Sequence, residues 1–286
     1  MENSLINYLN STYEFENGIY YNSMTGIKNH QKIVGKTIDV NNNIKIGNKL
    51  IHSCSRVGLR MLDIKPTDIG VVYGSGRGNL LTYVARNCKL VLGQEYNLHK
   101  LLSGQASLKL KRINNVLFLN TDLDEKVLFN NVFDFVIING TSKSYYNGKN
   151  DRISKIFHNV FKSLKKNGKL YFASNNKINY RKYICNRLSY KNREYLQSKY
   201  GYHKKLRKAG FKSIKSYAVF PDYKYPMKIL PMNNYDDCDY EPVYNNVGKM
   251  NIMERIKRKI YSQIDKILFN RLKLFDLSPS FIFIAK

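Results

Sequence analysis

The 286-residue chain has no tryptophan and only four cysteines, which lie far apart: Cys54, Cys88, Cys185 and Cys238. No CxxC pair or other metal-ligand spacing is present, so the cysteines favour reduced thiols in the cytoplasm over a zinc site or a disulfide framework. No apolar run approaches the roughly 18 residues that a membrane-spanning helix needs. Residues 1–10 lack a basic stretch followed by an apolar one, so we expect no secretory signal and a cytoplasmic location.

Acidic residues are also scarce. The chain has 21 Asp and Glu against 48 Lys and Arg, which gives a formal net charge of +27. Between residues 143 and 215, only Asp151 and Glu194 oppose 21 Lys and Arg. A merely solvated surface usually mixes both signs, so this segment favours an anionic partner. The alternative is a solvated face whose many lysines reflect an AT-rich base composition.

Apolar segments that read as strands alternate with segments that read as helices. The expected strands are 68–73, 89–95, 115–122, 133–140, 169–174, 213–220 and 280–286. The expected helices are 78–87, 97–111, 152–168 and 203–211, with Asn97 as an N-terminal cap and Gly168 as a C-terminal cap. This alternation predicts an α/β fold with a parallel sheet covered on both faces. Such sheets bind ligands outside the carboxyl ends of their strands.

The stretch VVYGSGRGNLL, Val71–Leu81, places three glycines within five positions directly after the first strand. It lacks the Lys-Ser/Thr pair of a nucleotide-binding P-loop, and its GxGxG spacing differs from the GxGxxG of dinucleotide sites. Glu95 ends the second strand, 21 residues after Gly74. A carboxylate at that position can accept hydrogen bonds from both ribose hydroxyls of an adenosine, so the pattern predicts a nucleoside-containing cofactor.

These segments resemble the class I family of methyltransferases that use S-adenosylmethionine (SAM). The resemblance rests on the glycine stretch with VLGQE (91–95), LNTDL (119–123), FDFVIING (133–140) and IFHNVFKSLKKNGKLYFASNN (156–176). It covers roughly residues 65–220 and the final strand. It implies a Rossmann-like, seven-stranded, mostly parallel sheet with helices on both faces and an antiparallel final strand, and it implies SAM as the cofactor.

The resemblance also implies which residues hold SAM. Gly74, Gly76 and Gly78 would lie against its amino-acid part, and Glu95 would hold the ribose. Asp122 would meet the adenine amino group, and Asn139 would face the region of methyl transfer. The neighbours that complete the expected cofactor site are Tyr73, Ser75, Tyr96 and Leu123. Val72 stands where the family usually has an acid that orients the methionine ammonium, which leaves a catalytically degenerate relative open.

Long segments follow the fifth and sixth strands, so we expect them to cover the acceptor. They contain the residues expected to bind it: Asn176, Asp222 and Tyr223. The stretch PDYKYP, 221–226, resembles a bacterial subgroup linked with glycan assembly. NGTSK follows the fourth strand instead of an NPPY-type turn, which speaks against methylation of exocyclic amines. No residue is identified as a catalytic base, and no metal site is expected.

Three regions follow from this interpretation. Residues 1–66 form an N-terminal helical or lid region, residues 67–220 with 279–286 form the SAM-binding core, and residues 221–278 form an insertion over the acceptor site. The insertion contains a basic amphipathic helix that either packs on the core or rests on an anionic membrane surface.

The predicted activity is methyl transfer from SAM to a small-molecule, sugar or glycan-linked acceptor, with an anionic one favoured. An RNA methyltransferase and a SAM-binding relative without activity are the alternatives, and a dinucleotide-dependent oxidoreductase is the least favoured. No oligomer interface is readable from the sequence.

Overall fold

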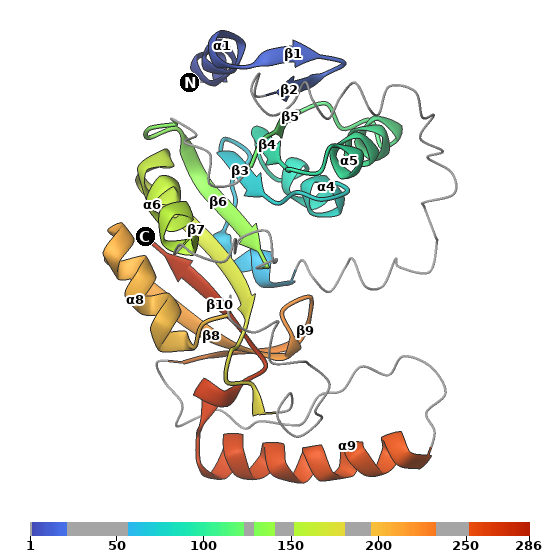
Figure 1. The fold of residues 1–286 in the computed structure, drawn as a ribbon, viewed down its shortest axis with the longest axis vertical. Coiled ribbons are helices and arrows are strands. Elements are labelled where there is room, and N and C mark those ends of the chain that lie inside the picture. Colours follow the sequence, from blue (N-terminus) through green and yellow to red (C-terminus); the bar gives the residue numbers. More distant parts are fainter. Residues whose placement is uncertain (1, 22–56, 123–128, 141–151, 181–195, 233–251) are drawn as a thin grey trace.

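In the computed structural model, one sheet organises the residues that the structure describes, which are 2–21, 57–122, 129–140, 152–180, 196–232 and 252–286 (Figure 1). The strand order is β1-β2-β5-β4-β3-β6-β7-β10-β8-β9. The seven expected strands are β3 (Ile69–Tyr73), β4 (Leu90–Gln94), β5 (Val116–Asn120), β6 (Phe133–Asn139), β7 (Leu164–Asn175), β8 (Ile214–Asp222) and β10 (Ser280–Ala285). Neighbours from β5 to β7 are parallel, whereas β10 runs antiparallel to both β7 and β8. The Rossmann-like fold with an antiparallel final strand is therefore confirmed.

Helices cover both faces of the sheet. The helices of the described residues are α1 (Glu2–Thr12), α4 (Asn79–Ala85), α5 (Leu98–Leu110), α6 (Arg152–Ser163), α8 (Lys199–Ala209) and α9 (Ile252–Asp265), with a short 3-10 helix η2 (Val57–Leu62). One apolar cluster joins the sheet to α1, α6 and α8, and a second joins it to α4, α5 and η2. All five residues of β3 are buried because both faces are covered, which explains its continuous apolar run.

The sheet extends beyond the seven expected strands at both edges. β1 (Glu14–Glu16) and β2 (Ile19–Tyr21) form a hairpin whose second strand runs parallel to β5. β9 (Tyr225–Pro231) pairs with β8 in the opposite direction. The N-terminal region, expected to be helical or a lid, thus contains a hairpin beside α1, and the sheet continues past residue 220. Strands of three residues are too short to display an alternating pattern, so the sequence did not reveal the hairpin.

The helix expected over 152–168 is also shorter than predicted. α6 ends at Ser163, β7 begins at Leu164, and the pairing with β6 shifts register between Phe133 and Phe135. Gly168 therefore lies in a strand and caps no helix. Leu164 continues the apolar stripe of α6, so periodicity alone could not show where the helix ends. The cap at Asn97 is confirmed, since its side chain accepts a hydrogen bond from the Lys100 amide.

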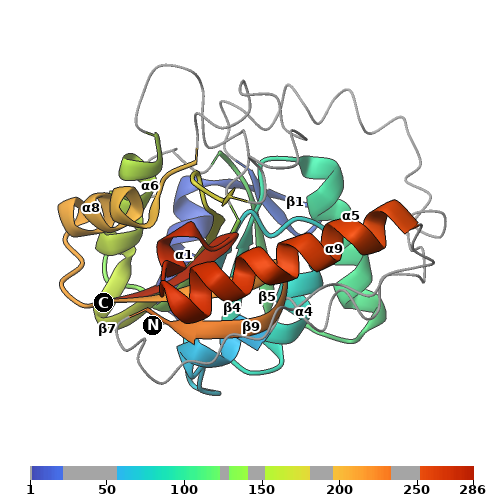
Figure 2. The same cartoon turned by 90° about the horizontal axis from the view of Figure 1, so that it is seen from below.

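An arm of helical turns leads from α9 into the final strand. α9 continues as a π-helix, η5 (Lys266–Arg271), and a 3-10 turn, η6 (Phe275–Leu277), precedes β10. Phe269 anchors the arm, since its ring lies 4.8 Å from that of Phe220 and 5.7 Å from that of Phe275. Figures 1 and 2 show α9 at the outer end of the molecule. No helix among the described residues is long and apolar enough to cross a membrane.

Asp265, the last residue of α9, gives the fold a pH dependence. The residue is fully buried, and burial raises the pKa of its carboxyl from 3.8 to about 8. The folded chain therefore holds this proton more tightly than the unfolded chain. The resulting stabilisation is fully present below pH 3.8 and is lost as the pH rises through about 8.

We expect Asp265→Asn to flatten this pH dependence and to raise Tm near pH 9 by roughly 5 °C, because the amide needs no proton to be neutral. Thermal melts from acidic to alkaline pH measure this, with Glu14→Gln on the exposed strand β1 as the control. Parallel pH profiles for Asp265→Asn and the parent would contradict the role of Asp265.

Candidate cofactor and acceptor site

The loop Gly74–Gly78 joins β3 to α4 and has three left-handed glycines. The φ angles of Gly74, Gly76 and Gly78 are 68°, 58° and 76°, values that favour glycine. A Cβ on Gly78 would lie 3.0 Å from Cα of Gly104, so Gly78 allows the loop to pack on α5. A Cβ on Gly76 would have its nearest neighbour 4.0 Å away, at the Gly74 carbonyl oxygen. Gly76 thus leaves open space beside the loop, whereas Gly78 serves packing.

Glu95 follows β4 directly and is 9 % exposed. Its Oε2 accepts a hydrogen bond from the Gly76 amide at 3.0 Å, and its Oε1 accepts one from the Asn97 amide at 3.0 Å. Each carboxylate oxygen has two lone pairs, so acceptor capacity remains for ribose hydroxyls. Asn120, which the sequence analysis missed, donates from Nδ2 to the carbonyls of Glu95 and Tyr96 at 2.9 and 3.0 Å. The structure thus fixes Glu95 beside the glycine loop.

Three buried side-chain atoms in this part of the structure have no hydrogen-bond partner among the described residues. They are Ser75 Oγ in the loop, Gln94 Oε1 at the end of β4 and Asn139 Oδ1 at the end of β6. Buried polar atoms are nearly always paired, so three such atoms at the ends of neighbouring strands fit a site that a polar ligand completes. These residues therefore fit a cofactor with hydroxyl, amino and carboxylate groups, as SAM has.

The expected adenine side is built around Asp122. Its Oδ2 forms an ion pair with Nη2 of Arg152 at 2.5 Å, and its carbonyl accepts a hydrogen bond from Gln94 Nε2 at 3.0 Å. Arg152 is the first residue of α6, and no local sequence pattern indicated this pairing. Tyr96 is 54 % exposed, so its ring is accessible, whereas Leu123 lies outside the described residues. The Arg152 ion pair fixes the Asp122 carboxylate at the carboxyl edge of the sheet.

Two expected positions face the core instead. Tyr73 is 3 % exposed and belongs to the apolar cluster with α1 and α6, where burial raises the pKa of its phenol. Only its backbone remains for a cofactor. Val72 is 1 % exposed in the cluster on the α4 side, so this position serves packing where the family usually has its acid.

Tyr223 reaches the end of β6 from the turn after β8. Gly140 has a φ of 109°, and a Cβ there would lie 3.1 Å from Cζ of Tyr223. The phenol ring therefore covers the backbone next to Asn139. Asp222 closes the turn, since its Oδ1 accepts a hydrogen bond from the Lys224 amide at 2.9 Å. The structure brings Asn139 and Tyr223 together, although they are far apart in the sequence.

The side chain of Asn176 hydrogen-bonds the backbone and does not face the expected acceptor position. The residue is fully buried, and its Nδ2 donates to the carbonyls of Asp276 and Ser278 at 2.7 and 2.8 Å. Its Oδ1 accepts a hydrogen bond from the Ile178 amide at 3.1 Å. Both amide hydrogens are thus used to tie β7 to the arm, and the expected contact of Asn176 with the acceptor does not fit this arrangement.

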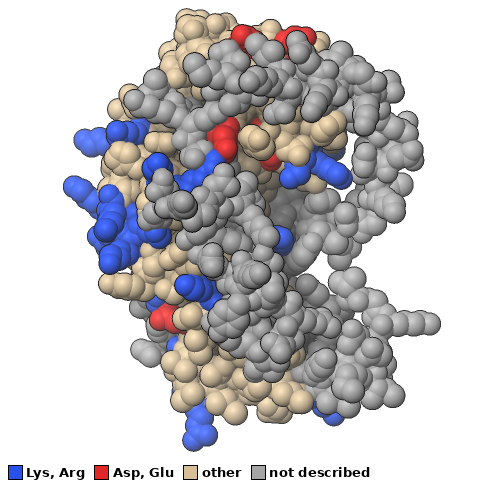
Figure 3. All heavy atoms as spheres, viewed as in Figure 1, with Lys and Arg blue, Asp and Glu red and all other residues tan. Residues whose placement is uncertain are grey.

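The basic residues that the structure describes within 143–215 lie largely on α6, α8 and the start of β7. Figure 3 shows them gathered on one side of the molecule, over α6 and α8. Some have structural partners: Lys165 Nζ lies 2.7 Å from Asp134 Oδ2, and Lys169 Nζ donates to the Leu62 carbonyl at 2.9 Å. Lys204, Arg207 and Lys208 on α8 are exposed. Residues 143–151 and 181–195 of this segment lie outside the described residues.

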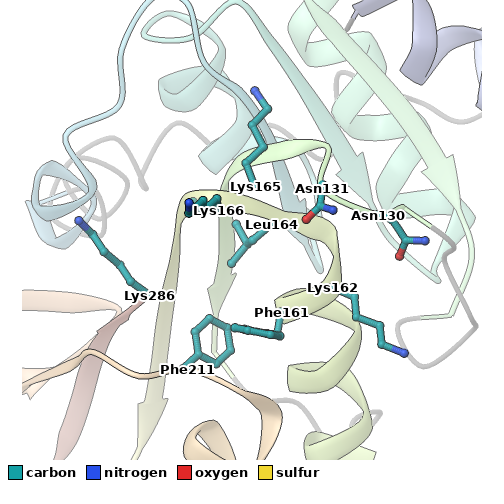
Figure 4. A pocket seen from close by; sticks show the side chains of 10 residues that line it. Asn130, Asn131, Phe161, Lys162, Leu164, Lys165, Lys166, Phe211 and Lys286 are labelled. Atoms are coloured by element: carbon teal, nitrogen blue, oxygen red, sulfur yellow. The ribbon is translucent and has the colours of Figure 1, made fainter.

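A cavity of about 520 Å³ lies at the opposite, amino edge of the sheet. It is lined by the beginning of β7 with Phe161, Phe211 and Lys286, and it includes none of the expected site residues. Figure 4 shows Lys162, Lys165 and Lys286 pointing in different directions around it. The lysines do not converge on one point, so this cavity is not the cofactor site.

A glycine loop after the first parallel strand and an acid at the end of the second define, together with this strand order, the SAM-dependent methyltransferases. The family model of the methyltransferase small domain matches residues 47–204, more than half of the chain, and the chain belongs to this family. It is an enzyme, and SAM is its cofactor. No curated protein matches the sequence.

Solved structures agree with the fold. A SAM-dependent methyltransferase from Archaeoglobus fulgidus superposes with a TM-score of 0.52 at 15% identity, over 84% of this chain and 94% of that one. Phosphoethanolamine N-methyltransferase 2 of Haemonchus contortus, in complex with SAM, gives a TM-score of 0.51 at 15% identity, over 81% of this chain and 51% of that one. At these identities the likeness concerns the fold.

The contacts of Glu95 predict that its substitution lowers the affinity for SAM. We expect Glu95→Ala to weaken SAM binding by about 1.5–3 kcal/mol, because charge-assisted hydrogen bonds to the ribose and to the loop are removed. Isothermal titration calorimetry with SAM measures the effect, with Glu14→Ala as a control on an exposed acid. An unchanged affinity for SAM in Glu95→Ala would exclude this residue from the cofactor site. Tighter binding of NADH than of SAM would contradict the interpretation of these residues as a SAM site.

Proposed function

We propose that this enzyme methylates an anionic small-molecule, sugar or glycan-linked acceptor, bound at the carboxyl edge of the sheet between β6 and the β8–β9 turn. The observation that carries the proposal is the packing of the Tyr223 phenol over Gly140, directly beside Asn139, whose buried Oδ1 has no hydrogen-bond partner among the described residues. A phosphate-bearing glycan or lipid-linked precursor is the favoured class of acceptor.

The proposed cofactor site uses backbone and side chains differently. The backbone of Gly74, Ser75 and Gly76 lies against the amino-acid part of SAM, and Glu95 holds the ribose. Asp122 and Tyr96 face the adenine. Bound SAM supplies an electrophilic methyl group on its sulfonium, so the chain mainly has to align the acceptor with it. Asn139 and Tyr223 carry out this alignment in the proposal.

Cations at the same edge support an anionic acceptor. Arg77 lies in the glycine loop, Lys177 follows β7 and Lys224 follows β8, and all three are exposed. None of them forms an ion pair with another described residue. Strands β7 and β8 end at the edge where β3 ends, so the three side chains surround the proposed acceptor position. A negatively charged group would gain from all three.

The position of the PDYKYP stretch suggests that different regions of the chain bind the cofactor and the acceptor. It forms the end of β8, the turn and the beginning of β9. We propose that this turn, with Asp222 and Tyr223, contacts the acceptor, as the resemblance to the glycan-linked subgroup suggests. In this proposal residues 67–220 with 279–286 bind SAM, residues 221–278 cover the acceptor, and residues 1–66 add a lid region.

RNA methylation is the second candidate, and the basic surface of α8 favours it. α8 runs back from the carboxyl edge toward the amino edge. The hydroxyl of Tyr202, near its start, hydrogen-bonds Ser174 at the end of β7, and Phe211, just past its end, packs edge-to-face against Phe161. Lys204 and Arg207 therefore lie to one side of the proposed acceptor position. A long polyanion could contact both groups of cations, whereas a small acceptor would contact only the group at the carboxyl edge.

Two matched charge reversals separate these candidates. For a small anionic acceptor, we expect Lys177→Glu/Lys224→Glu to lower kcat/KM roughly three- to thirtyfold through KM, since partly screened charges each contribute up to about 1 kcal/mol. Lys204→Glu/Arg207→Glu should then change little, and the SAM affinity should stay intact in both. Radiolabelled SAM with a panel of sugar phosphates and nucleotide sugars, or with bulk RNA, measures transfer.

The outcomes point in different directions. A salt-sensitive loss in both variants with RNA as the acceptor would favour the RNA candidate. Turnover that is indifferent to salt and to both reversals would favour a neutral acceptor and contradict the proposal.

A further inference from the structure

The arm α9–η5 has two apolar sides, and only one of them packs against the protein. Phe269 is fully buried, and Ile264 and Leu268 pack against the core. The exposed apolar side chains of the arm and of the turn after it are Ile260 (51 %), Ile267 (52 %), Leu272 (52 %) and Leu274 (42 %). Four of the ten exposed large apolar side chains in the described part of the chain thus fall within residues 260–274. Such clustering marks an interaction surface more often than chance exposure.

The charges beside this apolar side all have one sign. Lys259, Lys266 and Arg271 are exposed, and Lys273 is partly exposed. The sole acid between residues 259 and 274 is Asp265, which is fully buried. A surface that joins exposed isoleucine and leucine to the exposed cations Lys259, Lys266 and Arg271 matches an anionic lipid surface, which offers acyl chains below a layer of negative headgroups.

The arm occupies a suitable place in the molecule. Figure 1 shows α9 at one end, and Figure 2, which looks at that end, shows α9 lying across the front of the molecule. The hydrogen bonds from Asn176 to the Asp276 and Ser278 carbonyls fix the end of the arm to the carboxyl end of β7. A surface in contact with α9 would therefore lie at the end of the molecule that Figure 2 shows from below.

We propose that the outer side of α9–η5 and the turn after it, residues 259–274, docks on an anionic membrane surface. Ile260, Ile267, Leu272 and Leu274 enter the boundary between headgroups and acyl chains, and the flanking Lys and Arg contact anionic headgroups. The inference does not rest on the identity of the acceptor. A second copy of the chain would cover the apolar side chains but would bring its own cations against these, so the charge favours a lipid surface.

Cosedimentation with lipid vesicles tests the proposal. We expect the protein to bind vesicles of phosphatidylcholine mixed with phosphatidylglycerol, and to bind vesicles of phosphatidylcholine alone far more weakly. Ile260→Ser/Ile267→Ser should lower the partition coefficient about tenfold or more, because the burial of two half-exposed isoleucines is lost. Leu110→Ser, at a position 73 % exposed on α5, is the matched apolar control and should bind like the parent.

A charge variant tests whether the lysines beside the apolar side chains contact anionic headgroups. Lys259→Glu/Lys266→Glu should abolish the preference for phosphatidylglycerol, whereas Lys204→Glu/Arg207→Glu makes the same charge change on α8 and should retain it. Calorimetry with SAM on each variant verifies folding and keeps this test separate from the acceptor proposal.

Three results would overturn the inference. The first is equal binding to both kinds of vesicle, and the second is parental binding by Ile260→Ser/Ile267→Ser. The third is a dimer that forms without lipid and dissociates in that variant, which would assign the surface to a second copy.

Discussion

The carboxylate of Glu95 connects two backbone segments on which the cofactor side of the molecule depends. It accepts one hydrogen bond from the glycine loop, at Gly76, and another from the start of α5, at Asn97. The close approach of Gly78 to Gly104 holds the same two segments together further along. The loop is therefore held at its middle by the Glu95 side chain and at its end by backbone packing, and both set the space beside Gly76.

The strands of the sheet were predictable from the sequence where their burial produces a run of apolar residues. β3 and β10 are buried at every position, so their apolar runs were visible, and the glycines and Glu95 were found by their spacing. The strands β1, β2 and β9 and the end of α6 were missed. β1 and β2 have three residues each and carry no period, and Leu164 extends the helical stripe of α6. Asn120, Gln94 and Arg152 act through partners distant in the sequence. No local pattern could reveal them.

The two edges of the sheet differ in how their cations are used. At the amino edge, Lys165 is neutralised by Asp134, and the other lysines point apart. At the carboxyl edge, Arg77, Lys177 and Lys224 have no ion-pair partner among the described residues. A high net charge therefore says little about where an anion binds. The positions of the ion-pair partners are more informative, because they distinguish lysines that stabilise the fold from cations that are available to bind a ligand.

The position of β10 has a consequence for how the protein is made. This last strand in chain order lies between β7 and β8, so the β8–β9 hairpin with its Tyr223 turn joins the rest of the sheet only through it. On the ribosome, the parallel strands β3 to β7 can form early, but the β8–β9 hairpin joins them only after residues 280–285 have emerged. A nascent chain that lacks these residues would therefore expose the unpaired edges of β7 and β8, and unpaired strand edges are prone to aggregation.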